Sequence, residues 1–238
     1  MVKCSLSLLL ALGLLVGCQS SNQLVSTLPP PTFDGPRVAP RPAVPMPQLP
    51  PPEPVVSVAR ATQPGVPAGW IPTAKPRRWQ YIVIHHSATA TGGAAAFDRM
   101  HRDKGWDELG YHFVIGNGTD TRDGQIEVGS RWPKQKYGAH CKTPDNRYND
   151  YGIGICLVGN FDSARPTPAQ LQSLAKLTSY LMKTYNIPAS RVIGHGDAKP
   201  TECPGRNLSV AAVRRMATQM IAQADKRREP ELAAASTD

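Results

Sequence analysis

Tyr81-Ile82-Val83-Ile84-His85-His86-Ser87-Ala88-Thr89 is an apolar, β-branched run that contains two adjacent histidines. This pattern predicts a buried strand whose carboxyl end opens into a site. A second segment, Gly194-His195-Gly196-Asp197-Ala198-Lys199-Pro200-Thr201-Glu202-Cys203-Pro204-Gly205, holds a histidine and a cysteine eight residues apart, where prolines restrict the backbone. One histidine from the first segment, His195 and Cys203 would make three protein ligands for zinc, the number that catalytic zinc sites use. Ordinary strand-end histidines and a structural or disulfide cysteine are the alternatives.

Three further segments follow the first one in order: Gly110-Tyr111-His112-Phe113, Gly152-Ile153-Gly154-Ile155-Cys156-Leu157-Val158-Gly159 and Thr201-Glu202-Cys203-Pro204-Gly205. With these motifs in this order, the chain from about Trp79 to Met220 resembles the zinc-dependent N-acetylmuramoyl-L-alanine amidases. That family includes peptidoglycan recognition proteins and phage amidase-type lysozymes. The resemblance implies an enzyme that cuts the amide between N-acetylmuramic acid and L-alanine in peptidoglycan or its fragments.

The resemblance also implies the zinc ligands. It places the strand's ligand at His85, and alternation along a strand then directs His86 to the opposite face or to a supporting position. His195 and Cys203 complete the expected set around Zn²⁺. Cysteine would bind as thiolate, which adds a negative charge to the site.

Two further residues match the family's catalytic positions. The Tyr111 hydroxyl is expected to donate to an oxyanion or to hold the attacking water, with a core tyrosine as the alternative. Thr201 carries no charge, so its expected contribution is a hydrogen bond. Four more residues are candidate substrate contacts along a groove: His140, Trp106, Asn149 and Arg131. For His140 the alternative is an ordinary exposed histidine.

The first residues of the chain have the features of an export signal. Lys3 precedes an apolar stretch over residues 6–16, which is too short to span a bilayer. Leu15-Val16-Gly17-Cys18 resembles a bacterial lipoprotein box, which predicts a signal peptide over residues 1–17 and lipid on Cys18. Residue 19 is Gln and not Asp, which in the lipoprotein sorting pattern of a two-membrane bacterium implies the outer membrane, with the domain facing the periplasm. A plain secretory signal is the alternative.

Proline marks the boundary between anchor and domain. Residues 29–76 contain 16 of the 24 prolines, so residues 18–77 are expected to form a disordered, proline-rich, lipid-anchored linker. Residues 78–224 are expected to form the amidase domain, with a flexible tail over 225–238. This length suits one domain with a hydrophobic core.

The predicted strands and helices alternate along the chain. This order predicts an α/β fold, a single domain with a mixed central sheet flanked by helices. Thr167-Pro168-Ala169-Gln170 has the pattern of a helix start with a capping box, and Pro188 follows the predicted end of that helix. Another helix is expected over 94–103 and a third over 209–224. The expected strands cover residues 80–85, 111–115, 125–128, 152–158 and 191–194, the second and third joined as a hairpin.

The formal net charge of +9 is compatible with attraction to anionic wall polymers or lipids. Nucleic acid is not an expected partner, because the chain looks exported and lacks a basic helix or an aromatic RNA-binding motif. Peptidoglycan or muropeptides are the expected partners of a monomer. Three alternatives stay open: a peptidoglycan-binding protein without activity, a zinc peptidase acting within the stem peptide, and a structural zinc protein with His140 or Cys141 as fourth ligand.

Overall fold

The computed structural model describes residues 65–235, with side chains described as far as residue 227. The predicted signal peptide, Cys18 and most of the predicted linker lie outside these residues. None of the helices formed within residues 65–235 has both the length and the apolar composition that crossing a bilayer requires.

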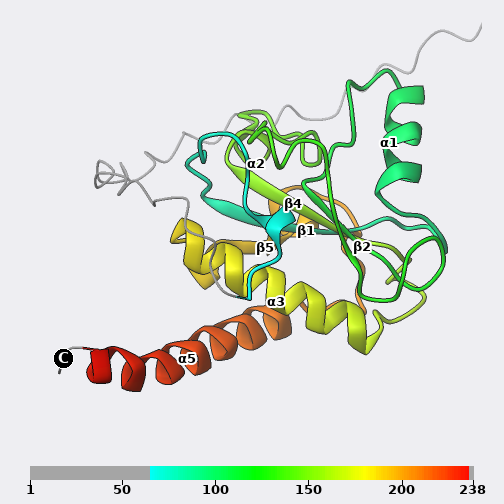
Figure 1. Ribbon diagram of the computed structural model, residues 1–238. Coiled ribbons are helices and arrows are strands. Elements are labelled where there is room, and N and C mark those ends of the chain that lie inside the picture. The colour runs from blue at the N-terminus through cyan, green and yellow to red at the C-terminus, as the bar shows by residue number, and fades with distance from the viewer. Residues whose placement is uncertain (1–64, 236–238) are drawn as a thin grey trace, which may run out of the picture. The chain divides into compact units, whose positions relative to one another are not determined.

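Helices and strands alternate along the described part of the chain (Figure 1). In order they are η1 (Ala68–Trp70), β1 (Tyr81–His86), α1 (Ala94–Asp103), β2 (Phe113–Ile115), β3 (Ile126–Val128), α2 (Arg147–Asp150), β4 (Gly152–Leu157), α3 (Pro168–Tyr185), η2 (Ala189–Arg191), β5 (Val192–Gly194), α4 (His195–Ala198) and α5 (Val210–Ala235). The short helices α2 and α4 were not expected from the sequence.

The strands form one mixed sheet in the order β3-β2-β4-β1-β5. β1 pairs in parallel with β4 and β5, β2 pairs in parallel with β4, and β3 is antiparallel to β2. The predicted mixed sheet and the predicted hairpin are therefore confirmed. Because β1, β4 and β5 are parallel neighbours, their carboxyl ends lie at the same edge of the sheet, where side chains from distant parts of the sequence can meet.

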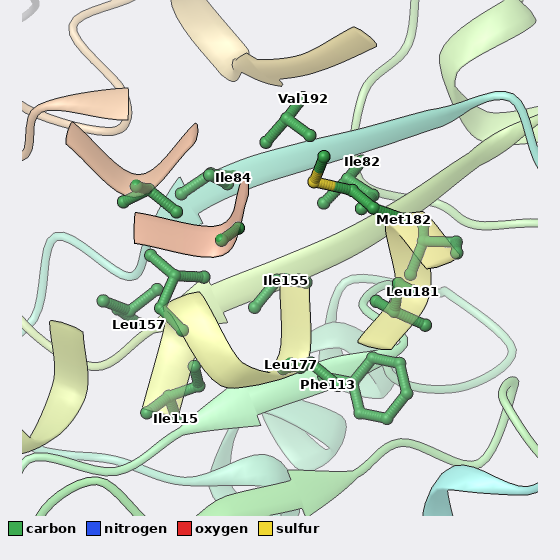
Figure 2. Close-up of a cluster of buried hydrophobic side chains, with 14 of the residues drawn as sticks. Ile82, Ile84, Phe113, Ile115, Ile155, Leu157, Leu177, Leu181, Met182 and Val192 are labelled. Atoms are coloured by element: carbon green, nitrogen blue, oxygen red, sulfur yellow. The ribbon is translucent and has the colours of Figure 1, made fainter. Parts of the chain in front are cut away.

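The larger apolar core lies between the sheet and helices α3 and α5. Alternate residues of β1 and β4, such as Ile82, Ile84 and Ile155, are fully buried on this face. Figure 2 shows them facing Leu177 and Leu181 of α3. This packing leaves the intervening residues of β1, including His85, on the opposite face.

A smaller apolar cluster covers that opposite face. It joins Phe97 of α1 to Val114 of β2 and Cys156 of β4, with Tyr111 packed against it. His85 stands on this face too, because it pairs with Cys156 near the carboxyl end of β1.

The predicted start of α3 is confirmed in atomic detail. The Thr167 hydroxyl accepts a hydrogen bond from the Gln170 amide at 3.0 Å, and the Gln170 side chain accepts one from the Thr167 amide at 3.2 Å. The Gln170 side-chain amide also donates to the carbonyls of Val158 and Ile115, at 2.9 and 3.3 Å. This capping box therefore also ties α3 to the ends of β4 and β2.

Packed residues lie on both sides of the expected domain, 78–224. Trp70, within the expected linker, is 5 % exposed and packs in the main core, while its carbonyl accepts a hydrogen bond from the Trp132 indole at 2.9 Å. At the other end α5 continues to Ala235 through the expected tail, and Lys183 of α3 pairs with Asp225. Proline content alone did not indicate that a large aromatic residue anchors the end of the linker.

Candidate metal centre

His85 is positioned by the strand that the opening segment predicts. It is the fifth residue of β1, pairs with Cys156 of β4 and is 1 % exposed. Its ring lies on the face that carries the smaller apolar cluster, 5.2 Å from the Tyr111 ring centroid. His86 points to the other face, where its Nδ1 accepts a hydrogen bond from the Phe161 amide at 3.1 Å.

His195 reaches the same place from the neighbouring strand, because β5 runs directly into α4 and His195 is the first residue of that helix. The Asp197 carboxylate accepts a hydrogen bond from the Gly194 amide at 2.9 Å and so holds this helix start. The chain then returns on itself, and the Gly196 amide donates to the Cys203 carbonyl at 2.7 Å. This closed loop brings Cys203 back beside the end of β1.

The side chains of His85, His195 and Cys203 converge on one point. Their candidate ligand atoms all lie within 4.8 Å of one another, and Cys203 Sγ lies 3.7 Å from His85 Nδ1. Ordinary bond lengths to a tetrahedral zinc would separate such a nitrogen and sulfur by roughly 3.6 Å. The arrangement therefore fits a metal ion with two nitrogen ligands and one sulfur ligand.

An unpaired buried atom supports this fit. His195 Nε2 is buried and has no hydrogen-bond partner, a situation that costs free energy in a folded protein. A metal ion bound between the three side chains would satisfy it. Two imidazoles and a thiolate are a donor set that suits zinc.

The protonation states of the three groups are consistent with metal binding. Burial lowers the pKa of His85 well below its usual value and that of His195 to about 4, so both rings are neutral and can act as ligands near pH 7. Burial raises the pKa of the Cys203 thiol to about 11. The thiol therefore keeps its proton until a cation compensates the buried negative charge, and metal binding would release that proton.

Tyr111 lies beside this group, two residues before β2 begins. Burial raises its pKa well above the usual value, so its hydroxyl stays protonated and can donate a hydrogen bond. The preceding residue, Gly110, donates its amide to His101 Nδ1 at 3.0 Å, and the exposed Trp106 packs on the His101 ring. Sequence reasoning missed His101, although its spacing of four residues from Phe97 places both on the inner face of α1.

Thr201 lies in the loop between His195 and Cys203 and is exposed. Its hydroxyl accepts a hydrogen bond from the Cys203 amide at 3.3 Å. It is thus near the ligand group and open to solvent, as a residue that contacts a substrate has to be.

Two of the expected substrate contacts, Arg131 and Asn149, have their polar groups bonded within the protein. Arg131 is 1 % exposed and donates to the carbonyls of Leu109 and Tyr137, at 2.6 and 2.8 Å, and to Asp107. Asn149 is 6 % exposed, and its side-chain oxygen accepts hydrogen bonds from two backbone amides. Both hold the structure together, whereas Trp106, at 41 % exposed, is available to a ligand.

His140 also differs from its expected position. It is 8 % exposed, so it is neither a surface histidine nor an open wall of a groove. Its Nδ1 lies 3.1 Å from His85 Nε2, and its Nε2 lies 3.2 Å from the Gly152 carbonyl. With both ring nitrogens engaged, His140 stands behind a candidate ligand and is not a fourth one.

The described side chains offer no closed set of four ligands. Among them, the cluster that could hold a metal consists of His85, His195 and Cys203, and the buried Cys141 is not part of it. A structural zinc site usually has four protein ligands, so the observed trio matches the open type of site instead.

Comparison with known proteins agrees with this arrangement. Residues 75–206 match the family model described as N-acetylmuramoyl-L-alanine amidase. The endolysin of Enterobacteria phage T3 is 36 % identical over 143 residues, which cover 56 % of this chain and 86 % of the endolysin. Peptidoglycan-recognition protein LB of Drosophila melanogaster is 32 % identical over 139 residues, covering 54 % of this chain and 55 % of that protein.

Solved structures include a similar fold. N-acetylmuramoyl-L-alanine amidase LysC from Clostridium intestinale URNW superposes with a TM-score of 0.51 at 33 % sequence identity. The match covers 58 % of this chain and 84 % of that one.

Proposed function

Because this chain belongs to the N-acetylmuramoyl-L-alanine amidase family, we propose that it is a zinc-dependent enzyme that hydrolyses the amide between N-acetylmuramic acid and L-alanine. His85, His195 and Cys203 would hold the ion. The observation that carries the proposal is the convergence of their ligand atoms within 4.8 Å, without a fourth protein ligand among the described residues. An open coordination position is what a hydrolytic zinc site requires.

A bound Zn²⁺ supplies Lewis-acid polarisation of the scissile carbonyl and activation of water near neutral pH. The chain's own residues would supply position and hydrogen bonds. The Tyr111 hydroxyl, kept protonated by burial, would donate to the oxygen on which negative charge develops. The exposed Thr201 would contribute a second hydrogen bond beside the ligand group. Trp106 would offer an aromatic surface to the substrate.

The proposed substrates are peptidoglycan and muropeptides, and the proposed role is remodelling of the wall or recycling of its fragments. We also propose that the chain carries an export signal and a lipid on Cys18. The lipid would anchor it to the outer membrane, and the domain would face the periplasm as a monomer. Incorporation of labelled palmitate into the full chain, and its loss in Cys18→Ala, would test the anchor. A chain that stays unlabelled in both forms would contradict it.

The activity can be tested on one defined muropeptide by mass spectrometry, with the full chain purified in detergent and supplied with zinc. The expected products are a free stem peptide and an intact glycan, both absent with Cys203→Ala. Shorter peptides would indicate a peptidase acting within the stem peptide. Tight binding of the muropeptide with no cleavage would indicate a non-catalytic peptidoglycan-binding protein.

A further inference from the structure

His140 is held in a closely fitted position against the paired strands β1 and β4. The side-chain oxygen of Asn149 accepts hydrogen bonds from the backbone amides of His140 and Cys141, both at 2.8 Å. Glycines at 138 and 154 leave room for the ring, because a methyl group at either position would overlap it. The surrounding residues therefore fix both the backbone and the ring of this histidine.

The hydrogen-bond partners of the ring determine where its proton lies. The Gly152 carbonyl can only accept, so the Nε2 of His140 that faces it at 3.2 Å carries the hydrogen. Of the described residues, no carboxylate hydrogen-bonds to His140, so the buried ring is neutral and its Nδ1 presents a lone pair. This lone pair faces His85 Nε2 at 3.1 Å and can only accept from it.

The hydrogen bond between His85 and His140 also fixes the position of the proton on the His85 ring. If His85 Nε2 carries its hydrogen toward His140, then His85 Nδ1 is the unprotonated nitrogen. That nitrogen is the one that lies 3.7 Å from Cys203 Sγ, on the side where the candidate ligands converge. The chain of hydrogen bonds from Gly152 through His140 thus leaves His85 in the tautomer that can bind a metal through Nδ1.

We propose that His140 is a positioning residue that orients His85 and fixes its tautomer, so that His85 binds the metal through Nδ1. The inference rests on the proposed zinc site, but it assigns a task that neither the family resemblance nor the ligand set requires. Outer hydrogen bonds of this kind raise the basicity of a histidine ligand and hold its ring in the binding orientation.

The tautomer can be read directly by NMR on the full chain labelled with ¹⁵N-histidine. In the metal-free protein, long-range proton–nitrogen correlations of His85 are expected to show hydrogen on Nε2 and a free lone pair on Nδ1. In the zinc-loaded protein the Nδ1 signal should shift while Nε2 keeps its hydrogen. Hydrogen on Nδ1 in the metal-free protein, or coordination through Nε2, would overturn the proposal.

Variants test the energetic consequence through zinc affinity, measured by competition with a chromophoric chelator. His140→Leu removes both hydrogen bonds and is expected to weaken zinc binding by about 10- to 100-fold. His140→Gln keeps an acceptor toward His85 and a donor toward Gly152, so most of the affinity should return. His112→Leu is the control for packing around His140, because the buried His112 ring lies edge-on to the His140 ring, with 5.8 Å between their centroids. The His112 ring hydrogen-bonds only to backbone groups of Gly154 and Lys136, so this variant leaves the hydrogen bond between His140 and His85 in place.

Affinity of His140→Leu equal to that of the wild type would overturn the proposal, as would an equal loss in His112→Leu. Thermal unfolding of each metal-free variant identifies any variant that fails to fold. If His140→Leu does not fold, the NMR spectra of the wild type test the proposal. A wild type that binds zinc through Nδ1 without cutting muropeptides would contradict the proposed function alone. A wild type that binds no zinc would overturn both the proposed function and the task assigned to His140.

Discussion

The backbone amide of His86 donates a hydrogen bond to the sulfur of Cys203 at 3.4 Å, although 117 residues separate the two. The donor is fixed by β1, in which the His86 side chain faces away from the candidate site. A backbone donor aimed at a sulfur favours the thiolate over the thiol. The strand therefore contributes both a candidate ligand, through His85, and support for the ligand from the far end of the domain.

Cys203→Ala is expected to abolish stoichiometric zinc binding, because only the two histidines of the group remain. Cys156→Ala is the control, since Cys156 is a free cysteine outside the ligand group. Zinc content after gel filtration, measured by inductively coupled plasma mass spectrometry, distinguishes the two. Equal zinc content in both variants would show that the sulfur of Cys203 is not a ligand.

Tyr111→Phe is expected to lower the turnover of muropeptide by about 100-fold, the usual cost of losing one oxyanion donor. Zinc content should not change, because Tyr111 is not in the ligand group. Tyr151→Phe, which removes the hydroxyl of a residue that is 44 % exposed, should leave turnover unchanged. If Tyr111→Phe turns over as fast as the wild type, the hydroxyl has no part in the chemistry.

The metal-free protein is expected to lose stability in mild acid. Burial lowers the pKa of His112 to about 4, whereas an unfolded chain protonates histidine near 6.5. The unfolded state thus binds more protons between these values, so the free energy of unfolding falls as the pH drops through this window. The share due to His112 reaches roughly 3 kcal/mol below pH 4.

Urea unfolding at several pH values, with chelator present, measures this dependence. His112→Gln should unfold with a shallower dependence on pH than the wild type, whereas Lys176→Ala, on the exposed face of α3, should follow the wild type. Parallel curves for His112→Gln and the wild type would mean that this histidine does not control acid stability.

Trp70→Ala is expected to destabilise the domain by about 3–5 kcal/mol, the usual cost of removing a buried large aromatic side chain. The reason is its 5 % exposure in the main core. Arg78→Ala, an exposed change at the boundary expected from sequence, should have little effect. Thermal or urea unfolding gives the comparison, and similar stability for the two variants would place Trp70 outside the folded unit.

Much of the fold could be predicted because its elements follow local rules. The capping box at Thr167 and the left-handed Asn186 at the end of α3 bracket one helix, and the apolar run of β4 is buried on both faces. Strand ends were less predictable. β2 begins at Phe113, two residues later than expected, although the His112 amide already donates to the Gly154 carbonyl of β4.

The site was predictable only as far as residue type and strand position carry information. Candidate ligands at the carboxyl ends of parallel strands meet at one edge, and the structure brings them together there. The tasks of Arg131 and His140 could not be predicted, since their partners are loop carbonyls and side chains far away in sequence. A buried arginine and an exposed one look the same in a sequence.

The return of the chain from β1 to the loop after β5 has a consequence for biosynthesis. His85 and Cys203 meet across 118 residues, and of the described elements only α5 follows Cys203. A nascent chain that ends before Cys203 would lack one side of the candidate metal centre. If the centre cuts the cell wall, the order of its ligands along the chain prevents this activity until synthesis has passed Cys203.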